Sequence, residues 1–225
     1  MCGNECIVKH SVGFREIFRL RCKSWNCAYC APRRRKRLIA GAINGKPNTF
    51  ITLTLPADRR LDPAQAVKDL SRAWRLIRKR DARRRNGKPV PFLAVVELTK
   101  VGTPHLHIIC RAKWIDQKWL SNCMAEIADA PIVHIARIDN MGRVAMYCGK
   151  YISKDTAKVG TNKRYWQSQD YALEDLYEKP PLQEGEFWGD PIMMGIKRFV
   201  AIMEDRGWVP RWINEDNCIM EPSTG

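Results

Sequence analysis

The sequence lacks any stretch that could span a membrane. No run approaches the roughly 20 consecutive apolar residues that a spanning helix needs, although 45% of the 225 residues are hydrophobic. The first ten residues, MCGNECIVKH, also lack the basic segment followed by an apolar one that typifies a secretory signal. These absences predict a cytoplasmic protein without a membrane partner. The length suits one well-buried core with an accessory element.

The sequence also has too few acidic residues to balance its basic ones. Against 39 Lys and Arg stand 24 Asp and Glu, which leaves a net charge of +15 at pH 7. An excess of this size predicts a polyanionic partner, with nucleic acid as the first choice. The runs RRRKR and RKRDARRR would attract phosphates without reading sequence, or form solvated faces. The first run supplies the candidate DNA contacts Arg33, Arg34, Arg35, Lys36 and Arg37.

Nine cysteines without an export signal argue against a disulfide framework, because the number is odd. Three of them have the spacing C-x4-C-x2-C, which suits a tetrahedral structural Zn²⁺ site with a fourth ligand from upstream. Cys6 is our choice for this ligand, and Cys2 and His10 are the alternatives. A cluster of reduced thiols without metal is the competing interpretation. The three spaced cysteines are Cys22, Cys27 and Cys30.

Hydrophobic periodicity predicts an α+β fold. Alternating apolar residues indicate four strands, and the apolar stripes between them indicate helices, one of which Asp62 would cap ahead of Pro63. The order βαββαβ is typical of a ferredoxin-like split βαβ antiparallel sheet with helices on one face and the other face free. The strands are expected at 49–55, 91–99, 105–111 and 132–138, the helices at 31–43, 63–86, 116–128 and 141–158.

Three segments follow from this pattern. A cysteine-rich zinc-binding head with a basic helix occupies residues 1–48, and the split βαβ domain with its following helix occupies residues 49–160. An extension rich in aromatic residues, 161–225, is expected to be helical around residues 191–207 and to pack on the domain or stack on bases.

Two histidines one residue apart form the first candidate site. His105 and His107 leave the same face of their strand, because side chains alternate with a period of two. If KVGTP is the whole hairpin loop, Thr99 faces His105 and Glu97 lies opposite His107, which would complete a metal site. Imidazole ligands alone would favour a softer ion than Mg²⁺. The competing interpretation is a solvated hairpin end, and His134 is expected to be a packing residue.

Two tyrosines form the second candidate site. Tyr147 and Tyr151 are four residues apart on an expected helix, and Lys150 and Lys154 project from the same side. A tyrosine hydroxyl has an ordinary pKa near 10, so it needs a divalent cation or a lysine to act as a nucleophile. Tyrosines at this spacing are otherwise packing residues.

These segments resemble, in order, the motifs of the HUH superfamily of replication initiator endonucleases, which serve rolling-circle plasmids and small single-stranded DNA phages. FITLTLP resembles the first motif, and GTPHLHIIC resembles the histidine-hydrophobe-histidine motif. YCGKYISK resembles the tyrosine motif in its two-tyrosine form. The resemblance covers residues 49–155, and CKSWNCAYCAPRRRKR is similar to the cysteine-rich head of the phage and plasmid branch.

The resemblance implies a metal-dependent reaction on single-stranded origin DNA. A tyrosine would attack a phosphodiester, forming a 5′-phosphotyrosine link and a free 3′-hydroxyl, and a second tyrosine could cut after one round while the first strand is rejoined. The implied ligands of Mg²⁺ or Mn²⁺ are His105, His107 and Glu97. The implied nucleophiles are Tyr147 and Tyr151, with Lys150 and Lys154 as their helpers.

The sequence therefore predicts a rolling-circle replication initiator with a zinc-binding head, in the host cytoplasm if a phage encodes it. Host replication helicase or polymerase would be further partners. A transposase or conjugative relaxase would use the same chemistry. The alternative from another class is a non-catalytic zinc-dependent DNA-binding protein, such as a repressor, in which the histidines and tyrosines are structural.

Overall fold

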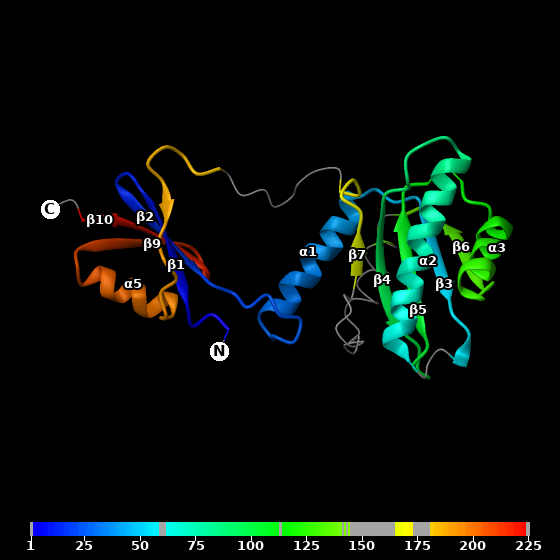
Figure 1. Cartoon of the computed structure of the whole chain (residues 1–225). Helices are drawn as coiled ribbons and strands as arrows, with labels where there is room; N and C mark the ends of the chain where they lie inside the picture. Colours follow the sequence, from blue (N-terminus) through cyan, green and yellow to red (C-terminus); the bar gives the residue numbers. More distant parts are fainter. Residues whose placement is uncertain are drawn as a thin grey trace. The chain divides into compact units, whose positions relative to one another are not determined.

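The chain divides into two units, each with its own antiparallel sheet (Figure 1). The computed structural model describes residues 2–58, 62–112, 114–140, 142, 144, 165–172 and 181–223. The central unit comprises Arg35–Leu176, and the terminal unit combines Met1–Arg34 with Tyr177–Gly225. The fold is thus α+β, as the sequence predicts. The head and the extension, which sequence analysis treats as separate segments, belong to one unit.

The sheet of the central unit has the strand order β6-β3-β5-β4-β7. Its first four strands have the order of a split βαβ arrangement, and β7 adds an edge beside β4. All pairings are antiparallel. The strands are β3 (Thr49–Thr54), β4 (Phe92–Leu98), β5 (Pro104–Cys110), β6 (Val133–Arg137) and β7 (Tyr165–Gln167).

Helices α2 (Pro63–Arg84) and α3 (Gln117–Ala128) begin at the caps that the sequence indicates. The carboxylate of Asp62 accepts a hydrogen bond from the Gln65 N–H at 3.0 Å, and that of Asp116 accepts from the Trp119 N–H at 2.6 Å. Both helices contribute to one core with alternate residues of the strands. This core includes Ile51, Leu53, Leu70, Trp74, Ala94, Leu106, Ile108, Leu120 and Met124.

The opposite face of this sheet is not bare, which corrects the expectation of a free face. Phe50, Leu93 and Ile109 project from it, and all three are buried. Helix α1 (Cys30–Asn44) is tied to the segment after β7, because the Tyr171 hydroxyl donates to the carbonyl of Ala42 at 2.8 Å.

This tie explains a glycine at the end of α1. A Cβ atom at Gly45 would collide with the ring of Tyr171. Arg111 donates to the carbonyls of both Gly45 and Tyr171 and so holds the two segments together.

The terminal unit has the strand order β8-β1-β2-β10-β9, with α5 (Ile196–Glu204) packed on one face. The helix agrees with sequence analysis, but the extension is not simply helical, because it also supplies three strands. Buried residues of both chain ends form the core, among them Cys6, Ile17, Val200, Cys218 and Met220. The strands are β1 (Cys6–Ser11), β2 (Phe14–Arg19), β8 (Phe187–Trp188), β9 (Trp208–Asn214) and β10 (Asn217–Pro222).

Within the described ranges, every helix is too short or too polar to cross a membrane.

Candidate functional site

The hairpin of β4 and β5 brings Glu97 to the two histidines, but in a different register from the expected one. Glu97 lies directly opposite His105, and Val95 lies opposite His107. The hairpin closes earlier than KVGTP suggests, because the Thr99 N–H donates to the Thr103 carbonyl at 3.0 Å. The expected pairing is therefore wrong by two residues. Because side chains alternate with a period of two, Glu97 and both histidines still share one face.

The ring of His107 is held at both nitrogens. Its Nδ1 lies 3.1 Å from the Thr52 hydroxyl, directly across from it on β3, and its Nε2 lies 2.9 Å from Glu97 Oε2. With the hydroxyl donating to Nδ1, the Nε2–H donates to the carboxylate. Phe50 stacks on the ring at 5.8 Å between centroids, and His107 is only 7% exposed. Its orientation is thus fixed before any ligand arrives.

His105 is partly exposed, and its ring centroid lies 6.1 Å from that of His107 at an angle of 61°. Burial lowers the pKa of His105 below its ordinary value of 6.5, and the nearby Glu97 carboxylate opposes this shift. The imidazole is therefore neutral at pH 7, and its lone pair is available to an electrophile or a cation.

This donor set fits a small divalent cation. Neighbouring ligands of an octahedral ion bound at about 2.1 Å lie roughly 3.0 Å apart, close to the 2.9 Å between His107 Nε2 and Glu97 Oε2. Two imidazoles and a carboxylate suit Mn²⁺ better than Mg²⁺. The three residues do not form a closed ligand group, because in the described part of the chain only the cysteine group below has all its ligand atoms within 4.8 Å of one another.

His134 faces the same side of the sheet as His107, since both lie opposite Thr52. It is exposed on edge strand β6, whereas Val133 and Ile135 pack toward the core. The packing role expected for His134 is therefore wrong. Tyr147, Lys150, Tyr151 and Lys154, together with most of the helix expected at 141–158, lie outside the described residues.

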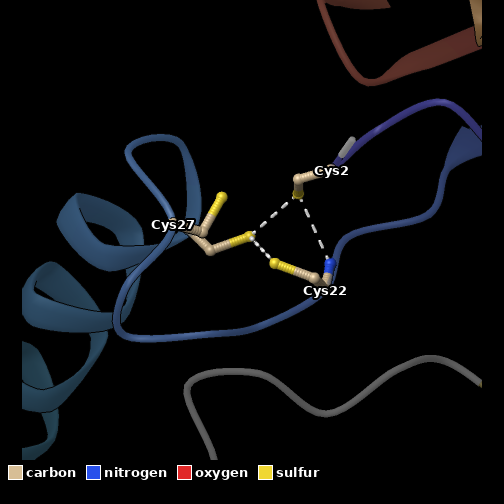
Figure 2. A group of neighbouring side chains, drawn as sticks. Cys2, Cys22 and Cys27 are labelled. Atoms are coloured by element: carbon tan, nitrogen blue, oxygen red, sulfur yellow. Dashed lines mark hydrogen bonds between the residues drawn. The ribbon is translucent and has the colours of Figure 1, made fainter.

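Four cysteines of the terminal unit gather from separate stretches of chain, as Figure 2 shows for Cys2, Cys22 and Cys27. The Sγ atom of Cys30 lies 3.4 Å from that of Cys2 and 3.7 Å from that of Cys22. Tetrahedral Zn–S bonds of about 2.3 Å place neighbouring sulfurs roughly 3.8 Å apart. The group thus has the composition and nearly the dimensions of a structural zinc site, and it can bind a metal such as zinc.

Cys2, and not Cys6, completes this group. Cys6 begins β1 and alternates with Val8 into the core of the terminal unit, where it is fully buried. Burial raises the pKa of the Cys6 thiol to about 11, so it is a poor metal ligand. Sequence analysis overlooked the strand and therefore the direction of this side chain. His10, the other alternative, stacks on Phe187 at 4.6 Å.

The thiols of the group differ before metal binding. The Cys22 N–H donates to Cys2 Sγ at 3.5 Å and lowers the pKa of Cys2 to about 6, whereas burial raises that of Cys30 to about 12. A metal ion would have to displace the proton of Cys30. Cys2 on the rim therefore supplies the first thiolate at neutral pH.

The basic run at the start of α1 is partly engaged within the terminal unit. Arg33 donates to Asp216 and, at 2.6 Å, to Glu215, and Arg34 donates to the carbonyl of Lys23. Arg21 donates to the same Asp216. These arginines fasten the cysteine-bearing loop to the β9–β10 turn, so not all of the run is free to meet phosphates.

The aromatic residues of the extension mostly pack. Trp166 on β7 packs against the core of the central unit, and Trp208 packs against that of the terminal unit. Trp188 meets Phe18 at 5.3 Å between ring centroids. Trp212 is 42% exposed.

These features define a basic α+β protein with two groups of residues suited to metal ions. Residues 48–156 match the family of replication-associated proteins of the ORF2 type. Over this stretch, just under half of the chain, the protein is similar to that family, consistent with a rolling-circle replication initiator and with DNA binding. No match was found among curated proteins or among solved structures.

Proposed function

We propose that this chain is a rolling-circle replication initiator that nicks single-stranded origin DNA through a tyrosine nucleophile and rejoins the strands. The observation that carries the proposal is the shared face of Glu97, His105 and His107, which lies within the stretch that matches replication-associated proteins. The net charge of +15 supports a nucleic-acid partner.

The described residues prepare the site for a scissile phosphate. Thr52 and Glu97 hold His107 in one orientation, so little reorganisation is needed during the reaction. His105 offers a neutral imidazole at pH 7. A divalent cation, when bound by His105, His107 and Glu97, would neutralise phosphate charge and polarise the P–O bonds.

The tyrosine pattern then supplies the covalent step. The hydroxyl oxygen of Tyr147 or Tyr151 forms a bond to phosphorus while the bond from phosphorus to the 3′ oxygen breaks. The tyrosine gives up its proton, and the departing oxygen takes one up as a 3′-hydroxyl. Attack by a 3′-hydroxyl on the phosphotyrosine reverses these bonds and rejoins strands. Lys150 and Lys154 would stabilise the negative charge that develops.

The cysteine group has a structural part in this proposal. Zn²⁺ bound by Cys2, Cys22, Cys27 and Cys30 would fix the loop that precedes α1. Host helicase or polymerase would extend the strand from the 3′-hydroxyl.

A denaturing-gel assay tests the reaction. The protein is incubated with labelled single-stranded oligonucleotides that include candidate origins, with Mn²⁺ or chelator, beside Tyr147→Phe, Tyr151→Phe and the double variant. We expect label that stays with the protein through denaturation and disappears with chelator and in the double variant. Salt-sensitive DNA binding without any adduct across all pools would instead identify a non-catalytic zinc-dependent DNA-binding protein.

A further inference from the structure

The loop between Cys22 and Cys30, here called the knuckle, carries two aromatic rings on its surface. Tyr29 is 62% exposed, and Trp25 is partly exposed. A guanidinium accompanies each ring, with Arg34 at 4.7 Å from the centre of Trp25 and Arg21 at 5.4 Å from that of Tyr29. The knuckle therefore combines apolar ring faces with positive charge.

The cations beside these rings are held in place. Arg34 also donates to the carbonyl of Lys23, and Arg21 donates to Asp216 in the β9–β10 turn. Since the four cysteines draw the loop together as well, the rings and guanidinium groups need little ordering when a ligand binds. Such preorganisation lowers the entropic cost of association.

The charge around the knuckle favours a polyanion. No acidic residue occurs between Glu16 and Asp58, whereas residues 19–37 contain eight Lys and Arg. A zinc tetrathiolate would carry a net charge of −2, and Glu215 and Asp216 add two further negative charges. The segment remains positively charged after this compensation, so an acidic partner is complementary to it.

We propose that the knuckle is a second DNA contact, which holds single-stranded DNA by stacking a base on Tyr29 and by attracting a phosphate to Lys23. Exposed rings beside fixed cations are the combination that binds single strands without reading sequence, because every unpaired base has a ring face. Bases in a duplex are already stacked on one another, which excludes double-stranded DNA as the preferred ligand. This contact goes beyond the nicking reaction and lies outside the residues proposed to perform it.

Fluorescence anisotropy with a labelled 20-nucleotide single strand and the matching duplex tests this contact on the whole chain. We expect Tyr29→Ala to weaken single-strand binding roughly 5- to 150-fold, and Tyr29→Phe, which keeps the ring, to change it less than about twofold. Phe187→Ala is the matched control, because Phe187 lies in the same unit and is similarly exposed at 57%. This control should bind as the unchanged protein does.

The salt dependence separates stacking from phosphate attraction. Lys23 has a positive φ of 51°, which asparagine tolerates, so Lys23→Asn should remove the charge without straining the backbone. It should reduce the slope of log K against log salt concentration by about 0.7, the value for one phosphate of a single strand. Tyr29→Ala should leave that slope unchanged.

Zinc content is measured for each variant, and Tyr29→Leu replaces Tyr29→Ala if the latter loses metal. The proposal is overturned if loss of the ring leaves single-strand affinity unchanged, or if it weakens duplex binding equally. Covalent adduct formation is scored in parallel. Adduct with unchanged affinity of the Tyr29 variants refutes the knuckle contact alone, and weakened affinity without adduct in any sample refutes the nicking reaction alone.

Discussion

Replacing Cys2 by serine should remove one of four metal ligands, whereas replacing Cys6 should leave the metal site intact. Structural zinc sites of this kind bind with an apparent free energy of about 10–16 kcal/mol. If the four thiolates contribute equally, the loss of one costs about 3 kcal/mol, or roughly a 100-fold weaker affinity for zinc. The effect arises at the site, because Cys2 Sγ lies 3.4 Å from Cys30 Sγ.

Cys6→Ser is the matched control, with the same chemical change in the same unit. A serine hydroxyl in the fully buried position of Cys6 should cost about 1–3 kcal/mol of folding free energy. Competition with a zinc-chelating dye measures the affinity, and thermal unfolding measures the stability. Reduced zinc affinity for Cys6→Ser with unchanged affinity for Cys2→Ser would refute the reasoning.

Four further predictions concern the sheet and the arginine network. Thr52→Val removes the hydroxyl at His107 Nδ1 and should weaken Mn²⁺ binding roughly 10- to 100-fold, whereas Thr52→Ser should retain it; equal affinities in a calorimetric titration would contradict this role. The imidazole of His105 should titrate below 6.5 by NMR, and lower still in Glu97→Gln, because the carboxylate that opposes desolvation is gone; an unmoved midpoint would exclude that influence. Since the unfolded chain then binds the proton at higher pH than the folded chain, the contribution of His105 to stability should decline as the pH falls through 6.5, which denaturant titrations at several pH values can measure against His105→Gln. Asp216→Asn should destabilise the terminal unit by about 1–3 kcal/mol, because Asp216 accepts from two arginines at 14% side-chain exposure; Glu221→Gln, whose partner Arg211 is exposed and 3.9 Å away, should cost less than about 1 kcal/mol.

Sequence analysis succeeded where the signals are local. The caps at Asp62 and Asp116 and the alternation along β3 and β5 depend on neighbouring residues, so the elements of the central unit follow from the sequence. The register of the β4–β5 hairpin depends on the turn that Thr99 and Thr103 form, which loop length alone does not fix. The face of Glu97 was nevertheless correct, because the error was an even number of residues.

The terminal unit could not be derived in the same way. Its strand β2 pairs with β10, which follows about two hundred residues later, and no local pattern reports such a partner. The choice of Cys6 over Cys2 failed for the same reason, since only the pairing of β1 turns Cys6 into the core. The roles of Tyr147 and Tyr151 remain predictions, because both residues lie outside the described part of the chain.

The pairing of β2 with β10 also bears on how the protein is made. The side chain of Arg19 donates to the carbonyl of Glu215 across a separation of 196 residues. During synthesis the central unit can fold while the β9–β10 segment is still untranslated. The cysteine-bearing loop gains its Asp216 and Glu215 anchors only when the last of these strands leaves the ribosome. A chain that stops early would keep the histidine face but lack the completed terminal sheet, so translation itself times the assembly of the two units.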